Sequence, residues 1–309
     1  MFLSRYLLVF FLLISPYIQA QELSPEVAAI VEAKPIDEMS GIARSVSYPG
    51  VFWVLNDSGD EARIFAIKDD GKNVIPTYSR FSFYGEEPEE GKELWQGFPV
   101  LYAENVDWES MTIDSNYLYI ADTGNNRNDR KDLGIYLISE IDPTASTRSA
   151  VIKHVPVYFP EQQSFPADDK HFDSEALFVD KGVLYLITKH RENGLLNRMA
   201  TGANLYRLDT MDSDNENPLI LVDSHKTLTA TTGAELSPDG QTLAVISYTD
   251  LWLFERPQEG DQWLSAPARQ IPLDTKILRQ VEAVSWVDDE TLILTNEQRD
   301  VFLIPVNTL

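Results

Sequence analysis

The sequence predicts an all-β fold, a single β-propeller of five blades. Three apolar runs separated by turns recur five times along the chain, and repetition on this scale indicates stacked or radially arranged units. The recurring stretches lie roughly 50 to 70 residues apart, which is longer than solenoid repeats and near the length of four-stranded propeller blades. They begin with MSGIA (39–43), WESMT (108–112), SEALF (174–178), GAELS (233–237) and VEAVS (281–285).

Each unit continues with further predicted strands. The second runs are FWVLND, LYIADT, LYLITK, LAVISY and LILTNE, and the third runs are IFAI, IYLI, LYRL, LWLF and VFLI. Turn formers such as SYPG, DDGK and SPDG separate these runs. Most units also offer a fourth strand, in YSRFSFYG, VIKHVPVYF, PLILV and ARQIPL.

The last unit has no fourth strand after its third run. A segment around 28–35 is expected to fill this place and close the ring, because closure removes exposed sheet edges. A sixth, degenerate blade within the long connection 68–105 is the alternative to five.

The first twenty residues form a predicted signal peptide, followed by one propeller domain at 21–309. They combine an early Arg5, an apolar core at 6–14, a break at Pro16 and a small Ala20 before Gln21. An uncleaved anchor is the alternative, and no later segment is apolar enough to span a membrane. We therefore expect a monomer exported to the periplasm or the exterior of a Gram-negative bacterium.

Composition narrows the range of partners. The chain has no cysteine, so burial alone must hold the fold together, and its formal net charge is −24 at pH 7. Nucleic acid is excluded as a partner, because its binding relies on clustered Lys and Arg. No organic cofactor is expected either.

Propeller geometry brings two sequence columns to one mouth of the central channel, since the first strand of a blade starts where the second ends. The first column holds Ser40, Glu109, Glu175, Ala234 and Glu282, and the second holds Asn56, Asp122, Thr188, Ser247 and Asn296. Just beyond the second column lie Asp57, Thr123, Lys189, Tyr248 and Glu297. Glu235 is one residue out of register and is expected to face the opposite side.

Three glutamates around one axis repel one another unless something compensates their charge. One possibility is a cation, and carboxylate and amide oxygens favour Ca²⁺ or Mg²⁺ over zinc. The predicted metal ligands are Glu109, Asp122, Glu175, Glu282 and Asn296. Alternatively, each glutamate bonds backbone N–H groups of the next blade, or Glu109, Glu175 and Glu282 act as catalytic acids and bases without a metal.

Loops after the second strands carry the candidate ligand-binding residues. ADTGNNRNDR (121–130) and NDSGDE (56–61) are rich in turn formers and oxygen ligands, and the scarce basic residues lie in loops of the same kind. Such a rim suits a small anionic molecule or a peptide. The predicted binding residues are Asn56, Asp57, Asn126, Arg127, Lys189, His190, Tyr248, Glu297 and Arg299.

Several motifs follow one another along the chain: SGIA with LNDSGD, DWESM with LYIADTGNNRNDR, DSEALFVD with LYLITK, TGAELSPDG and VEAVSW. This succession resembles an uncharacterised family of secreted bacterial β-propeller proteins. That family is loosely similar to phytase-like esterase and gluconolactonase-type propellers. The resemblance covers about residues 39–304 and implies an acidic mouth that holds Ca²⁺, with Glu109, Asp122, Glu175 and Glu282 at the matching positions. The chain lacks a phosphate-binding cluster of lysines, which argues against phytase activity itself.

Two functional classes follow. The first is a binding or scaffold propeller whose mouth holds a small ligand, a peptide or a cell-wall fragment. The second is a metal-dependent hydrolase of an ester, lactone or phosphoester, in which one ring carboxylate activates water. The fold alone cannot choose between them.

Overall fold

The computed structural model describes residues 22–77, 95–193 and 195–309, so the predicted signal peptide lies outside the described residues. Strands dominate, and the only α-helix in the described part of the chain is the four-residue α1 (Thr275–Leu278). None of its helices has the length and apolar character that a membrane span requires.

Antiparallel pairing groups the strands in fours. The first three groups are β2 (Met39–Arg44), β3 (Phe52–Asn56), β4 (Arg63–Ile67) and β5 (Phe98–Leu101); β6 (Trp108–Asp114), β7 (Tyr117–Asp122), β8 (Gly134–Ser139) and β9 (Ser149–Tyr158); and β10 (Ser174–Asp180), β11 (Val183–Thr188), β14 (Thr201–Leu208) and β15 (Asn217–Thr229). The other two are β16 (Thr231–Leu236), β17 (Thr242–Ser247), β18 (Asp250–Glu255) and β19 (Ala268–Pro272); and β20 (Val281–Asp288), β21 (Thr291–Asn296), β22 (Asp300–Pro305) and β1 (Ala29–Ile30).

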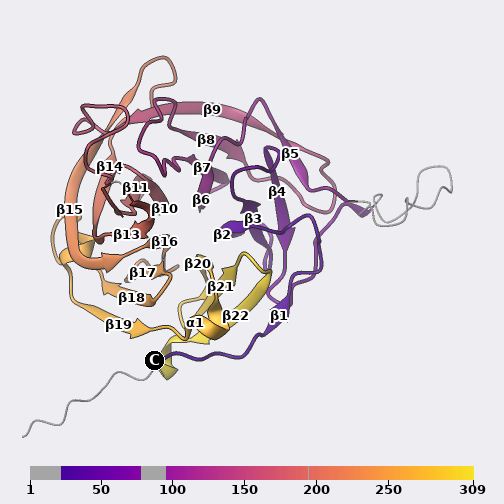
Figure 1. Cartoon of the computed structure of the whole chain (residues 1–309). Helices are drawn as coiled ribbons and strands as arrows, with labels where there is room; N and C mark the ends of the chain where they lie inside the picture. Colours follow the sequence, from indigo (N-terminus) through magenta and orange to yellow (C-terminus); the bar gives the residue numbers. More distant parts are fainter. Residues whose placement is uncertain (1–21, 78–94, 194) are drawn as a thin grey trace, which may run out of the picture.

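The groups stand around a common centre, with β2, β6, β10, β16 and β20 innermost (Figure 1). This arrangement is a β-propeller, and the predicted all-β propeller class is confirmed. Short parallel pairings of β9 with β5 and β15 join three groups into one 12-stranded sheet. A small hairpin of β12 (Arg191–Glu192) and β13 (Leu195–Met199) lies between β11 and β14 in the chain.

The N-terminal segment pairs where the sequence analysis expects it. Ala29 lies opposite Val301 in the antiparallel pair of β1 and β22. In the first group, the proposed fourth strand YSRFSFYG lies outside the described residues, and β5 pairs with β4.

The core lies between neighbouring groups rather than in one centre. In the described residues, each of five apolar clusters draws its side chains from two adjacent groups. Trp53, Trp108, Trp263 and Trp286 are among the largest fully buried side chains. Because every blade face is covered by the next blade, the strands read as nearly continuous apolar runs.

Each inner strand carries an irregularity at the same point. Its pairing with the second strand shifts by one residue, and the residue passed over is Ser40, Glu109, Glu175, Thr232 or Glu282. A β-bulge of this kind leaves one residue unpaired and re-aims its side chain. The fourth member of the predicted column is therefore Thr232 and not Ala234, because a bulge adds a residue that apolar alternation does not reveal.

Candidate functional site

Three of the five bulges carry glutamate, and these side chains gather at one end of the ring. Glu109, Glu175 and Glu282 are 6%, 3% and 8% exposed. The charge of Glu175 acts on Glu109, and that of Glu282 acts on Glu175. The structure thus brings together the three glutamates that the repeats placed in one column, at what we call the acidic end.

The other two bulges tie the ring instead. Ser40 Oγ donates to the carbonyl of Trp108 at 3.1 Å, and Thr232 Oγ1 donates to that of Val281 at 3.0 Å. Each acceptor begins the inner strand of the next group. The hydroxyl groups of Ser40 and Thr232 therefore make hydrogen bonds to the backbone of the next group, a role that was one of the alternatives for the glutamates.

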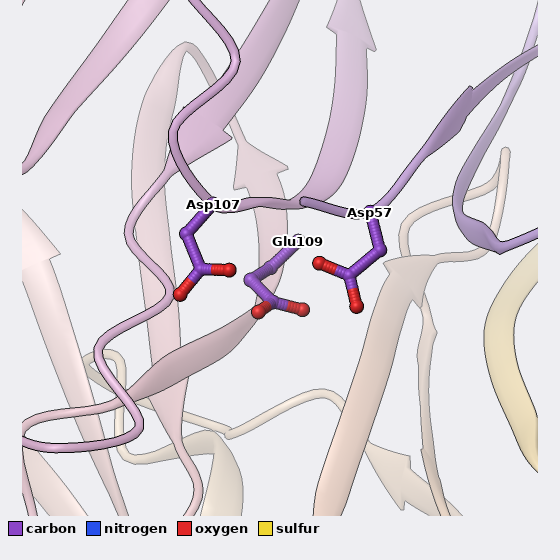
Figure 2. A group of neighbouring side chains, drawn as sticks. All are labelled: Asp57, Asp107 and Glu109. Carbon is purple, nitrogen blue, oxygen red and sulfur yellow. The ribbon is translucent and has the colours of Figure 1, made fainter. Parts of the chain in front are cut away.

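Asp57, Asp107 and Glu109 form a carboxylate trio (Figure 2). One oxygen from each lies within 4.8 Å of the others. Asp57 follows β3, Asp107 precedes β6, and Glu109 is the bulged residue of β6. The end of β3 and the start of β6, which belong to neighbouring groups, thus bring three acidic side chains together.

Glu109 has no compensation for its charge within the described part of the chain. Its carboxylate, although buried, accepts no hydrogen bond and makes no ion pair there. Burial raises the pKa of Glu109 well above its usual range, and Glu175 and Asp57 add to this effect. Burial together with Asp57 and Asp173 raises the pKa of Asp107 to about 6. Such crowding favours either a proton or a cation at the trio.

The nearby basic side chains are committed to other acids. Lys189 Nζ bonds the Glu175 carboxylate and also donates to the Tyr248 hydroxyl at 3.1 Å. Arg191 bridges Asp173 at 3.1 Å and Glu175 at 3.4 Å. Burial opposes the charge on Lys189, but the neighbouring acids outweigh it, and the pKa of Lys189 is raised. Two cations therefore balance Asp173 and Glu175, and no basic side chain of the described residues forms an ion pair with a member of the trio.

Glu282 borders the same network. Burial raises its pKa to about 7, although Lys189 and a hydrogen bond with Tyr248 act in the opposite direction. Glu297 is hydrogen-bonded to Glu282 and receives a bond from Gln280 at 2.9 Å. Glu282 is thus a proton-exchanging group near neutral pH.

Four of the five predicted metal ligands lie outside the trio: Glu175 and Glu282 belong to the network around Lys189, and Asp122 and Asn296 have other partners. Asp122 is ion-paired with Arg130 at 2.9 Å and accepts the Asp107 N–H at 3.0 Å. Asn296 donates to the Leu278 carbonyl and to Asp300, both at 3.0 Å, and accepts the Asp300 N–H. Both side chains close turns after second strands, so their oxygens are already used there.

Several predicted binding residues also have local partners. Asn56 donates to the Pro35 carbonyl and to Asp60, each at 2.8 Å, and Asn126 accepts from Arg191. His190 is buried, which lowers its pKa to about 3, and it stacks on His171 with ring centres 3.9 Å apart. The remaining two are solvent-facing: Arg127 is exposed and Arg299 is half-buried in a turn with positive φ.

Asp107 and Asp173 are not among the site residues predicted from the sequence. Both precede a bulged glutamate by two residues, in DWE (107–109) and DSE (173–175). A search for this repeated D-x-E spacing would have found them. Asp173 is fully buried and also accepts the Asn125 N–H at 2.7 Å.

Gly124 packs directly against the trio. A methyl group at this residue would lie 2.5 Å from Asp107 Cγ and closer still to Glu109 Oε1. We expect Gly124→Ala to lower the free energy of unfolding by about 1–3 kcal/mol, because overpacking forces its surroundings to move. Urea unfolding measures this loss. In a Glu109→Ala background the same change should cost less, and an equal cost there would contradict the proposed crowding.

Comparison with known proteins gives distant structural neighbours. No family model matches the chain, and no curated protein is similar enough to match. A PQQ-bound aldose sugar dehydrogenase from Streptomyces coelicolor is 11% identical, with 92% of this chain and 97% of that chain covered and a TM-score of 0.47. A gluconolactonase from Xanthomonas campestris is 10% identical, with 94% and 99% covered and a TM-score of 0.41.

A WD40 β-propeller domain of Doa1 is 10% identical over 86% of this chain and 78% of that chain, with a TM-score of 0.39. Similarity this remote carries no information on the chemistry of the acidic end. Fold and site together define the chain as a β-propeller with buried carboxylates at one end of its ring.

Proposed function

We propose that the acidic end binds a divalent cation, Ca²⁺ by preference, and that the ion holds a small oxygen-rich or anionic ligand. The observation that carries this proposal is the trio of Asp57, Asp107 and Glu109, whose oxygens converge within 4.8 Å with no basic side chain paired to Glu109 in the described residues. A cation between them would turn mutual repulsion into attraction.

The donor set favours calcium. Carboxylate oxygens suit hard cations, and Ca²⁺ takes six to eight oxygen ligands in flexible geometry. Three side chains leave further coordination positions for water and for oxygens of a ligand. The histidines of this end are unsuited to zinc, because His190 is stacked on His171 and bonded to Thr188 at 3.0 Å.

Hydrolysis of an ester, lactone or phosphoester is the second candidate. It is favoured by the Lys189 ammonium, which donates to the Tyr248 hydroxyl at 3.1 Å beside the buried carboxylates. A cation would polarise the scissile group, Glu282 would take a proton from the attacking water, and the Lys189 ammonium would stabilise the developing oxyanion.

We make further proposals about the protein as a whole. We take the five strand groups as five blades, with β1 closing the last one, and the protein as a monomer exported to the periplasm or the exterior. A small anionic molecule or a peptide is its expected partner.

Two measurements test the proposal. Elemental analysis of the purified protein together with calorimetric titration of calcium should give one site per chain, and Glu109→Gln should remove it. A panel of chromogenic esters and lactones then separates the two functions. Turnover that needs calcium and falls in Glu282→Gln supports hydrolysis, whereas calcium binding without turnover supports a binding protein. Absence of a calcium site in the wild type would refute both the proposed ligand-binding function and the proposed hydrolysis.

Stability without a cation should fall as the pH rises. The pKa values of Asp107 and Glu282, about 6 and about 7, lie above the value near 4 of unfolded chains. The folded protein therefore holds more protons between about pH 4 and pH 7, so stability is lost as the pH rises through this window. Melting curves from about pH 5 to pH 8 should show this decline, and Asp107→Asn should flatten it. A melting temperature that rises over this range would contradict the assignment.

A further inference from the structure

A pocket lies at the opposite end of the ring from the carboxylate trio. Its cavity of about 360 Å³ is lined by residues near the C-terminal ends of all five inner strands. One lining residue from each strand is Arg44 of β2, Ile113 of β6, Val179 of β10, Glu235 of β16 and Ser285 of β20. The bulged glutamates sit at the beginnings of these strands, so the two sites are separate. We call this cavity the Glu235 pocket.

Glu235 lies in this pocket, three residues beyond the bulged Thr232 of the same strand. Thr112 Oγ1 donates to its carboxyl group at 3.1 Å, although β6 and β16 belong to groups that are not neighbours in the ring. The Leu236 N–H also donates to it at 3.1 Å. Burial raises the pKa of Glu235 to about 8, so it is mostly protonated at neutral pH and adds little negative charge.

Polar groups without partners line the same cavity. The Ser285 hydroxyl is buried and makes no hydrogen bond. A buried polar group without a partner costs stability, and a ligand hydroxyl would satisfy it. Within the described ranges, neither the Arg44 nor the Lys181 side chain makes an ion pair or a hydrogen bond.

The other charged side chains of the pocket have partners within it. Arg256 holds Asp180 through two bonds of 2.9 and 3.0 Å, and Asp239 accepts from the Ser237 hydroxyl at 2.6 Å and is also influenced by the charge of Arg256. With Glu235 protonated, three basic and two acidic side chains line the pocket, which gives a formal charge of +1. A cationic pocket in a chain of net charge −24 suits an anion with a single charge better than a phosphate dianion.

We propose that the Glu235 pocket binds a small hydroxycarboxylate, with its carboxylate on Arg44 and Lys181 and a hydroxyl on Ser285. Guanidinium groups match carboxylates through two parallel hydrogen bonds. The side walls are apolar, with Val46, Ile113, Val179 and Trp286. A molecule of roughly ten to fifteen non-hydrogen atoms fits a cavity of this size.

Calorimetric titration with gluconate tests the proposal on protein stripped of metal, so that a cation at the acidic end takes no part. One molecule should bind per chain. Glucose lacks the carboxylate and hexanoate lacks the hydroxyls, so both should bind at least tenfold more weakly. Arg44→Met and Lys181→Met should each weaken gluconate binding about tenfold, since hydrogen bonds to charged groups contribute the most. Ser285→Ala should weaken it less.

Two controls keep the outcome clear. Lys226→Met removes an exposed lysine on the outer strand β15 and should leave binding unchanged. Glu109→Gln should also leave it unchanged, whereas it abolishes the calcium site of the proposed function. Melting curves establish that each variant folds. No binding at millimolar gluconate, equal binding of glucose, or loss of binding in Glu109→Gln rather than Arg44→Met would overturn the proposal.

Discussion

Calcium is expected to raise the melting temperature of the protein by roughly 5 °C or more over that in chelator. A ligand that binds only the native state stabilises it by about 2.7 kcal/mol at a hundredfold excess over Kd, and about 1 kcal/mol shifts the midpoint by roughly 2–4 °C in a chain of this size. The physical source is the trio, in which Glu109 is buried without a partner among the described residues. Differential scanning calorimetry in chelator and in millimolar calcium measures the shift.

Glu109→Gln should change the melting temperature both in chelator and in calcium. It removes one of the three like charges, so the metal-free protein becomes more stable while the calcium response shrinks. Glu290→Gln is the matched control, because Glu290 is exposed in the turn between β20 and β21. Identical melting of the wild type with and without calcium would contradict the metal site.

Lys189→Met is expected to destabilise the protein by about 3 kcal/mol, because it removes one partner of a buried ion pair and leaves Glu175 only Arg191, which lies 3.4 Å away and also pairs with Asp173. Lys189 and Glu175 are each 3% exposed, and the Lys189 ammonium also contacts the Tyr248 ring at 4.7 Å from its centre. Urea unfolding at neutral pH measures the loss.

A double variant separates the contribution of the ion pair to stability from that of the packing of the Lys189 side-chain stem. Glu175→Gln combined with Lys189→Met removes both charges and should recover a large part of the lost stability, because no buried charge is left without its partner. Lys226→Met, on the exposed face of β15, should change stability little. A loss in Lys189→Met below about 1 kcal/mol, or a double variant no more stable than the single one, would show that the pair is not structural.

The repeats determined the fold class. Apolar runs with turns between them recur because each blade must cover both neighbouring blades, and this pattern is visible in the residues themselves. The same recurrence placed Glu109, Glu175 and Glu282 in one column, since equal positions in successive blades meet at the same end of a ring.

Tertiary structure decided which charges meet. The bulge in each inner strand moves one residue out of the pairing, so Thr232 replaced Ala234 in the column. Lys189 and Arg191 are close in the sequence, and they pair with Glu175 and Asp173. Asp57 and Asp107 belong to different strand groups, and both lie beside Glu109. Side-chain pairing between separate segments of the chain depends on distances of a few ångströms, and apolar periodicity carries no information on that scale. For the same reason, Asp122 and Asn296 have the right residue types for a metal site, but local hydrogen bonds already hold their oxygens.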